Sequence, residues 1–297
     1  MGTPSISGFT FVRNAITYDF PLRESLLSLM SVCDDVVVVV GRSDDATLEL
    51  VRSLDDGRLT IVETVWDDSL REGGRVLAQQ TDIALSHCRS DWSVYLQADE
   101  VLHEDDRERL RDAIHAAHND SRIDALLVRY LHFYGSYDYL GTGRQWYRQE
   151  IRAVRNTGSV VSWGDAQGFR RRAHNDTFEK LRARRTDVRV FHYGWVKPPQ
   201  VQMVKQRAAN RLWHDDDWIA ANLPDAEAFD YDSAYQLERY TGTHPAVMKG
   251  RVEDSRAWSR AFDPTRLRRK SLAMRITDAI EAMTGWRVAE YRNFIEV

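Results

Sequence analysis

Five consecutive valines at residues 36–40 constrain the fold of this chain more than any other feature of its sequence. They lie in the stretch DDVVVVVG, at residues 34–41. An unbroken run of β-branched residues favours a strand that is buried on both faces, and such strands belong to parallel sheets with helices on either side. The sequence around the run should therefore supply further strands and covering helices.

The first half of the chain alternates strand and helix patterns in the way that this expectation requires. Helical spacing of apolar residues, with capping residues or a proline at the first turn, predicts helices between apolar strand-like runs. Strands are expected at 6–12, 34–41, 58–65 and 92–97, and helices at 21–33, 43–54 and 73–88. This rhythm predicts βαβ units in an α/β fold whose ligands gather outside the carboxyl ends of the strands.

The second half has a different pattern. Residues 106–118 suit a helix, and residues 123–135 and 186–196 suit long strands. Helical signals follow at 200–214 and 271–286. The change of pattern predicts one domain at 1–200, with a first half at 1–106 and a second half at 107–200. A helical extension (201–297) is expected to pack on that domain.

Composition excludes several classes of function. The net charge of −4 does not favour nucleic acid as a partner. No apolar run approaches the roughly 18 residues of a membrane-spanning helix, and a signal peptide is not expected. Cys33 and Cys88 lie in apolar segments without metal-ligand spacing, which is typical of reduced core cysteines. A cytoplasmic protein is therefore predicted.

Acidic residues follow the fourth expected strand directly. The apolar run ends at Gln97, and Asp99 and Glu100 come next. Magnesium and manganese take oxygen ligands, and magnesium uses few carboxylates when phosphates complete its shell. Asp99 is the better candidate for the metal, with Glu100 beside it to share the ion or orient the loop. His192 ends a later strand and could complete the shell.

Three short motifs resemble glycosyltransferase family 2, whose members have the GT-A fold. They are GRSDDAT, DWSVYLQADE and the later HYGW, and the resemblance covers about the first 200 residues. It implies a mostly parallel central sheet flanked by helices. Residues 1–200 would be the catalytic domain, with a Rossmann-like nucleotide-binding half (1–106) and an acceptor half (107–200). It also implies a metal-dependent, inverting transfer of a sugar from a UDP or GDP sugar to a saccharide or other hydroxyl acceptor. Synthesis of bacterial surface polysaccharides or glycoconjugates would be a setting for such a reaction.

The resemblance also assigns roles to individual residues. Asp99, Glu100 and His192 would hold Mn²⁺ or Mg²⁺, and Asp165, in SWGDAQGF, would be the catalytic base. The donor nucleotide would be bordered by a longer set: Phe11, Val12, Arg13, Asn14, Gly41, Ser43, Asp45, Arg75, Gln97 and Ala98.

Two departures from the family pattern keep alternatives open. Gln97 stands where the metal motif usually has its first aspartate, and Val40 and Gly41 stand where an acidic residue usually follows the second strand. A degenerate nucleotide-sugar-binding module would explain both changes. A nucleotidyltransferase on a similar sheet is a weaker alternative, because no glycine-rich basic loop follows the first strand.

The helix at 271–286 raises a separate question about partners. Its apolar face includes Leu272, Ile276 and Met283, and the basic residues 268–270 precede it. An amphipathic helix of this kind packs on the body of the protein or on a second subunit in a homodimer, or lies on a membrane surface. Peripheral attachment to the inner face of the membrane is therefore an option alongside a purely cytoplasmic location.

Overall fold

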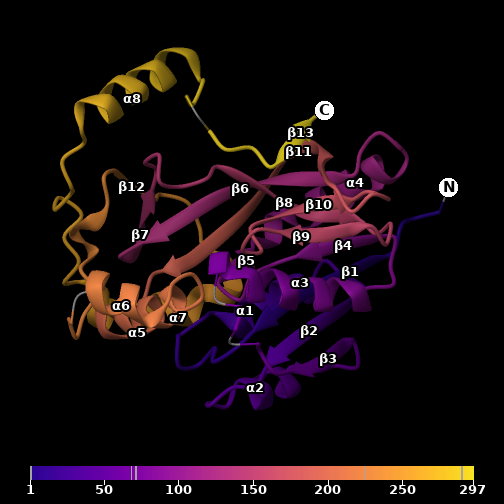
Figure 1. Cartoon of the computed structure of the whole chain (residues 1–297), viewed down its shortest axis with the longest axis horizontal. Coiled ribbons are helices and arrows are strands. Elements are labelled where there is room, and N and C mark those ends of the chain that lie inside the picture. The colour runs from indigo at the N-terminus through magenta and orange to yellow at the C-terminus, as the bar shows by residue number, and fades with distance from the viewer. Residues whose placement is uncertain (1, 68, 71, 224, 289) are drawn as a thin grey trace.

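The computed structural model describes residues 2–67, 69–70, 72–223, 225–288 and 290–297. A central sheet runs through the molecule, with helices packed on its two faces (Figure 1). The order of its main strands is β3-β2-β1-β4-β8-β6-β11-β10-β9.

The N-terminal half has the predicted parallel arrangement. Its strands are β1 (Ile6–Val12), β2 (Asp35–Gly41), β3 (Leu59–Thr64) and β4 (Trp92–Tyr95), and each pairing among them is parallel. The helices between them are α1 (Leu22–Met30), α2 (Thr47–Ser53) and α3 (Arg75–His87), with the short 3-10 helix η1 (Glu72–Gly74) before α3.

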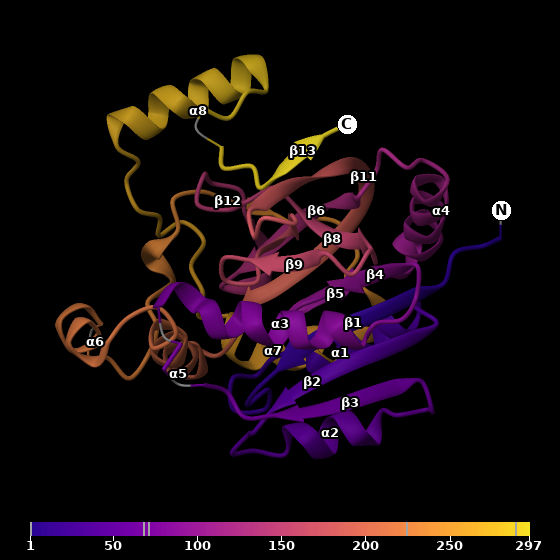
Figure 2. The same cartoon turned by 45° about the vertical axis from the view of Figure 1, so that its right-hand side comes forward.

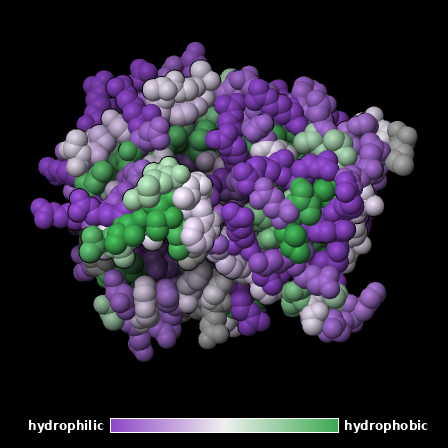
Figure 3. Space-filling model, turned by 90° about the horizontal axis from the view of Figure 1, so that it is seen from above, coloured by the Kyte–Doolittle hydropathy of each residue, from purple (hydrophilic) through white to green (hydrophobic). Residues whose placement is uncertain are grey.

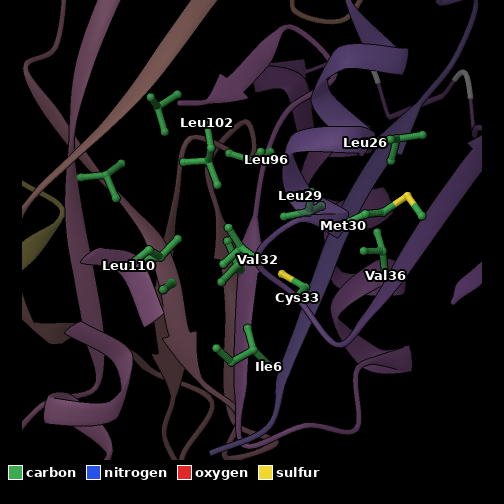
Figure 4. Close-up of a cluster of buried hydrophobic side chains, with 14 of the residues drawn as sticks. Ile6, Leu26, Leu29, Met30, Val32, Cys33, Val36, Leu96, Leu102 and Leu110 are labelled. Carbon is green, nitrogen blue, oxygen red and sulfur yellow. The ribbon is translucent and has the colours of Figure 1, made fainter. Parts of the chain in front are cut away.

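The valine run is buried on both faces of the sheet, as its sequence predicts. Val36, Val38 and Val40 pack in one apolar cluster, which contains residues of α1, α2 and α4 (Arg107–His118). Part of that cluster is drawn in Figure 4, where Val36 lies near Leu29 and Met30. Val37 and Val39 point to the opposite face, into a second cluster with Ala84 and Leu85 of α3. Strand β2 therefore holds two helical layers together.

The second half makes the sheet mixed, whereas the sequence predicted a mostly parallel one. Its strands are β6 (Ala125–Tyr134), β7 (Ser136–Gly141), β8 (Gln149–Arg155), β9 (Val160–Trp163), β10 (Gly168–Arg172) and β11 (Phe178–Trp195). Strand β8 is antiparallel to both β4 and β6, while β6 is parallel to β11. Short turns join β6 to β7 and β9 to β10, and such connections allow only antiparallel neighbours.

A short strand connects the acidic loop to the second half of the sheet. Strand β5 (Glu100–Leu102) pairs antiparallel with β11, and the register sets Glu100 opposite His192. The amide of Tyr193 also donates to the carbonyl oxygen of Asp99 at 2.8 Å. This pairing fixes the loop that follows β4 against the end of β11. The 3-10 helix η2 (Glu104–Asp106) then leads into α4.

The segment after residue 200 is not purely helical, in contrast to its prediction. Its helices are α5 (Pro199–Asn210), α6 (Asp216–Asn222), α7 (Lys249–Ser259) and α8 (Leu272–Thr284), with 3-10 helices η3 (Tyr231–Ser233) and η4 (Ala246–Met248). Strand β12 (Leu237–Arg239) pairs with β7, and β13 (Phe294–Glu296) pairs with β11. Helix α8 stands apart from the sheet in both Figure 1 and Figure 2. None of the helices in the described ranges has the length and apolar character needed to cross a bilayer.

Candidate active site

A cavity of about 650 Å³ opens at the carboxyl ends of the parallel strands. One wall comes from the ends of β1 and β4, and a second comes from α3 and the residues after β3. The third wall belongs to α5 and the residues that follow it, so the segment after residue 200 takes part in the site. The lining residues from that segment are Lys205, Ala208, Ala209, Arg211, Leu212, Trp213 and Asp216.

Six of the residues predicted from the sequence line this cavity: Phe11, Val12, Arg13, Gln97, Ala98 and Asp99. Three others hold the neighbouring loops together instead. The amide of Asn14 donates to Oγ of Ser43 at 3.0 Å, and Oδ1 of Asn14 accepts from the amide of Asp44 at 2.8 Å. Asp45 accepts from the amide of Thr17 at 2.8 Å. Asn14, Ser43 and Asp45 therefore position the loop that carries the lining residues.

Gly41 lies behind the cavity because a tryptophan occupies the space over it. A Cβ on Gly41 would lie 2.3 Å from Nε1 of Trp66, so any larger residue would displace the indole. Trp66 lines the cavity, 6.0 Å from the ring of Phe11 between centroids. Among the described residues its buried Nε1–H has no hydrogen-bond acceptor. An aromatic wall thus stands where the family pattern has an acidic side chain.

Asp99 is buried and faces two basic side chains. Its Oδ2 lies 3.1 Å from Nζ of Lys205 and 3.8 Å from Nε2 of His192. Burial acts to raise the pKa of Asp99, but the positive charge of Lys205 and the smaller effects of His192 and Lys197 outweigh it and hold this pKa well below its usual range. The carboxylate is therefore ionised at neutral pH.

The hydrogen bonds of His132 and His192, whose rings meet edge to face with centroids 4.9 Å apart, determine which nitrogen of His192 is free. Burial lowers the pKa of both His132 and His192, so both rings are neutral at pH 7. Nε2 of His132 lies 2.8 Å from the carbonyl oxygen of Tyr147 and must carry its proton. Nδ1 of His132 then accepts from Nδ1–H of His192 at 2.9 Å. Nε2 of His192 is left with a lone pair directed toward Asp99.

Space for an ion exists between these two groups. A Cβ on Gly194 would lie 2.6 Å from Nε2 of His192 and 2.7 Å from Oδ2 of Asp99, so the glycine leaves a niche that both atoms face. The described residues contain no cluster of three or more His, Cys, Asp or Glu side chains suited to a metal. Two protein ligands and an open side match a divalent ion whose shell is completed by substrate phosphates. The residues present therefore fit Mn²⁺ or Mg²⁺.

Glu100, the third predicted metal ligand, points away from this niche. Its carboxylate is fully buried and forms a two-point ion pair with Arg152, at 2.8 and 2.9 Å. The hydroxyl of Tyr130 donates to Oε1 at 2.7 Å, and the amide of Gln97 donates to Oε2 at 3.1 Å. Every oxygen of Glu100 therefore has a donor, and the side chain holds the loop in place.

Asp165 and Arg75 lie outside the cavity lining. Asp165 is half-buried beside the cavity. A Cβ added to Gly74 would lie 2.8 Å from the Cβ of Asp165 and 3.1 Å from the ring of Trp213. Burial raises the pKa of Asp165, which is the direction expected of a general base. Arg75 lines a second, neighbouring cavity.

Sequence reasoning missed Lys205, His132 and Trp66 as members of the site. His132 and Trp66 have no distinctive motif, because their positions depend on the pairing of β6 with β11 and on the turn after β3. Lys205 did have a signal. Arginine supplies nearly all the basic residues of this chain, so a lysine on the helix directly after HYGW was unusual.

Comparison with known proteins gives a family and several similar structures. The model of the family described as Glycosyl transferase family 2 matches residues 21–178, which is more than half of the chain. TarS residues 1–349 from S. aureus, solved in complex with UDP, is 22% identical over 42% of this chain and 35% of that chain, with a TM-score of 0.33. A second TarS structure is 14% identical over 69% of this chain and 39% of that one, with a TM-score of 0.41.

The mannosyltransferase PcManGT from Pyrobaculum calidifontis, solved in complex with GDP-Man and Mn²⁺, is also similar. It is 16% identical over 96% of this chain and 77% of that chain, with a TM-score of 0.42. This chain thus spans less than two-fifths of the length of the two TarS chains. No curated protein matches the sequence.

Proposed function

The chain belongs to glycosyl transferase family 2 and is a glycosyltransferase with the GT-A fold, and we propose that it moves a sugar from a nucleoside-diphosphate donor to a hydroxyl of a saccharide acceptor. We further propose that transfer depends on Mn²⁺ or Mg²⁺ and inverts the anomeric centre. The observation that carries this proposal is the pair of Asp99 and His192, which face one niche at the edge of the large cavity.

The donor nucleotide would occupy the cavity of about 650 Å³, with its base near Phe11 and Trp66. A UDP or GDP sugar remains the expected donor. Asp99 and His192 would hold the cation, and Glu100 has no place among its ligands because its oxygens are bonded to Arg152, Tyr130 and Gln97. The cation, when bound, would supply positive charge to the diphosphate leaving group.

The chain's own residues carry the remaining steps. Asp165 would take the proton of the acceptor hydroxyl as the oxygen attacks the anomeric carbon. The bond from the anomeric carbon to the donor phosphate oxygen breaks, and the nucleoside diphosphate leaves. Lys205 lines the cavity beside Asp99 and would donate hydrogen bonds to the departing oxygens. A single displacement of this kind inverts the anomeric configuration.

Thermal denaturation with a panel of nucleoside diphosphates, each with and without Mn²⁺, tests the proposal first. We expect one base to raise the melting temperature much more when metal is present. The matching nucleotide sugar should then release nucleoside diphosphate, and the Asp99→Asn variant should lose at least about a hundredfold in this rate. Asp112→Asn, the same change at an exposed position of α4, is the matched control.

Other outcomes would favour the alternatives. Undiminished turnover by Asp99→Asn without metal would remove Asp99 from the reaction. Nucleotide binding without metal enhancement or turnover would indicate a degenerate binding module. Pyrophosphate release from a nucleoside triphosphate would indicate a nucleotidyltransferase.

For α8 we propose a peripheral membrane contact. Ser271 caps the helix by accepting from the amide of Met274, and Gly285 ends it. Leu272, Ile276 and Met283 are exposed, and an apolar patch is visible on the left of the surface in Figure 3, in the region of α8. In a flotation assay the protein should rise with anionic liposomes at low salt and be released from them at high salt. Absence of flotation together with a dimer in light scattering would instead assign the face to a second copy.

A further inference from the structure

A second cavity, of about 480 Å³, lies next to the proposed donor site. It is formed by α3, by β9 and by the ends of β10 and β11 that meet it, so it belongs to the expected acceptor half and the helix beside it. Leu70 lines both cavities, which makes them neighbours. A molecule bound in the second cavity would therefore lie close to a sugar bound in the first.

The proposed base stands between the two cavities. Asp165 directly follows Gly164, which lines the second cavity. A Cβ on Gly74 would lie 2.8 Å from the Cβ of Asp165 and 3.1 Å from the ring of Trp213, which lines the donor cavity, so Asp165 also lies near that cavity. A hydroxyl offered from the second cavity toward the donor would thus pass Asp165.

The lining of the second cavity suits a saccharide. Trp163 and Phe178 form an aromatic wall, with ring centroids 5.4 Å apart and ring planes tilted by 54°. The guanidinium of Arg170 covers one face of Trp163, 3.7 Å from its ring centroid, while Phe178 remains 42% exposed. Gln79 and Asp82 of α3 supply polar atoms beside that wall. Sugars bind in such places because their C–H faces pack on aromatic rings while side-chain amides and carboxylates pair with their hydroxyls.

Charge gives the cavity its second property. Arg75 and Arg172 both line it, and among the residues that the structure describes neither forms an ion pair with a carboxylate. Asp82 is the acidic residue in the lining, and its Oδ1 already accepts from the amide of Ser162 at 2.6 Å. Arg172 also lies over the ring of Phe178, 5.9 Å from its centroid, and its charge acts on Asp82. The lining therefore carries more positive than negative charge, and its two guanidinium groups can bind an anion in a two-point manner.

We propose that the second cavity is the acceptor subsite and that it binds an anionic saccharide, one that carries a carboxylate or a phosphate group. Arg75 and Arg172 bind the anionic group, and Trp163 and Phe178 pack on the sugar. The acceptor hydroxyl is thereby held at Asp165. This inference rests on the proposed function, because it assigns an acceptor to the same transfer reaction.

Binding of small sugars to the full chain tests the inference. The donor cavity is first saturated with the nucleoside diphosphate and Mn²⁺. Methyl β-glucuronide and glucose 6-phosphate are then compared with methyl β-glucoside, a neutral analogue of the glucuronide in which a hydroxymethyl group replaces the carboxylate. Tryptophan fluorescence and saturation-transfer NMR report binding. We expect each anionic probe to bind at least about fivefold more tightly than the glucoside, as two charge-assisted hydrogen bonds predict.

Variants then locate the bound anion. Arg172→Gln should remove the preference for the anionic probes, whereas Arg89→Gln, at an exposed position just after α3, should keep it. The preference is the ratio of the affinities for an anionic probe and for the glucoside, both measured on the same variant. Partial unfolding lowers both signals equally and leaves this ratio unchanged. Comparison of the glucuronide with the phosphate shows which anion the site favours.

Two results would overturn the inference. One is equal or tighter binding of the neutral glucoside, and the other is no binding of either anionic probe at about 20 mM, well above the millimolar Kd of weak sites. Failure of the proposed function has a different signature, because then no nucleoside diphosphate binds with Mn²⁺ in the first step.

Discussion

Gly194 is a glycine for a reason of space. Its backbone does not adopt the left-handed conformation that favours glycine, yet a Cβ there would lie within 2.7 Å of both Nε2 of His192 and Oδ2 of Asp99. A single methyl group would fill the niche that these atoms face. A substitution of Gly194 therefore tests metal binding with less effect on folding than a substitution of Asp99 or His192.

Gly194→Ala should weaken Mn²⁺ binding at least about tenfold, since the methyl group takes the space of a ligand-sized atom. Electron paramagnetic resonance of free Mn²⁺ measures this affinity without any substrate. Gly143→Ala is the control, because a Cβ there has no neighbour closer than 3.6 Å. Unchanged Mn²⁺ affinity in Gly194→Ala would place the metal elsewhere.

Lys205 competes with a metal for one oxygen atom. Its Nζ lies 3.1 Å from Oδ2 of Asp99 and 2.8 Å from the carbonyl oxygen of Gly194, and both groups border the niche. A divalent ion at the niche would repel this ammonium group and push it toward the donor diphosphate. The lysine would then change partners during the reaction cycle.

Lys205→Met should consequently bind Mn²⁺ more tightly, by about tenfold or more, because a positive charge a few ångströms away is removed. Its turnover should fall at the same time, because the leaving group loses a donor. A purely structural lysine would give the opposite metal result, since its loss would loosen Asp99. Mn²⁺ titration and nucleotide release on the same sample therefore distinguish the two roles.

At the scale of single residues, the sequence could identify only those site residues that lie within a recognisable motif. Asp99 and His192 follow strand ends in recognisable text, and the structure places them 3.8 Å apart. The burial of Glu100 against Arg152 could not be predicted, because it depends on β5 pairing with β11 and on β8 lying beside β4. Adjacent carboxylates in sequence thus have separate tasks.

At the scale of elements, the alternating strands and helices of the first half were predicted. Strands β7 to β10, helices α6 and α7, and the three-residue strands were not. The strands β5, β12 and β13 are too short for any periodicity, so only their partners in the sheet define them. Their effect is large nevertheless. Strand β13 joins the end of the chain to the sheet through β11, although the sequence predicted a helical extension from residue 201 that only packs on the catalytic domain.

The variant Phe294→Ala tests whether that extension is part of one folding unit. Phe294 of β13 is 9% exposed and packs with Leu181 and Ala183 of β11. Its truncation should cost about 3 kcal/mol of unfolding free energy. Ile295→Ala, on the same strand but 51% exposed, should change it by less than about 0.5 kcal/mol.

Urea unfolding followed by far-UV circular dichroism measures both variants. If the catalytic part and the extension form one unit, Phe294→Ala shifts a single transition. If the curve instead has two transitions and Phe294→Ala shifts only one of them, residues 201–297 unfold separately from the catalytic domain.

At the scale of the whole molecule, buried carboxyl groups set how stability varies with pH. Burial acts to raise the pKa of Asp124, but hydrogen bonds from Arg182 and Arg171 lower it overall. Its stabilising effect is therefore present at neutral pH and lost in acid. Glu150 acts in the opposite direction. Burial raises its pKa to about 7, and the nearby charges of Glu100 and Asp165 add to the rise.

Glu150 should make the protein less stable as the solution becomes more alkaline. Between the unfolded pKa of 4.5 and the folded pKa of about 7, the folded chain holds a proton that the unfolded chain has released. The free energy of unfolding must then fall as pH rises through this window, and the loss is complete above it. A shift of this size corresponds to about 3 kcal/mol.

Glu150→Gln replaces the neutral acid by a group of nearly the same shape that never ionises. We expect the variant to match the parent protein near pH 4 and to exceed it by about 2–3 kcal/mol at pH 8. Urea unfolding at both pH values measures the difference, and Glu238→Gln, an exposed change on β12, should leave the pH dependence as it is. A Glu150→Gln advantage of equal size at pH 4 and pH 8 would contradict the argument, because a gain independent of pH comes from packing or hydrogen bonding and not from the ionisation of a buried acid.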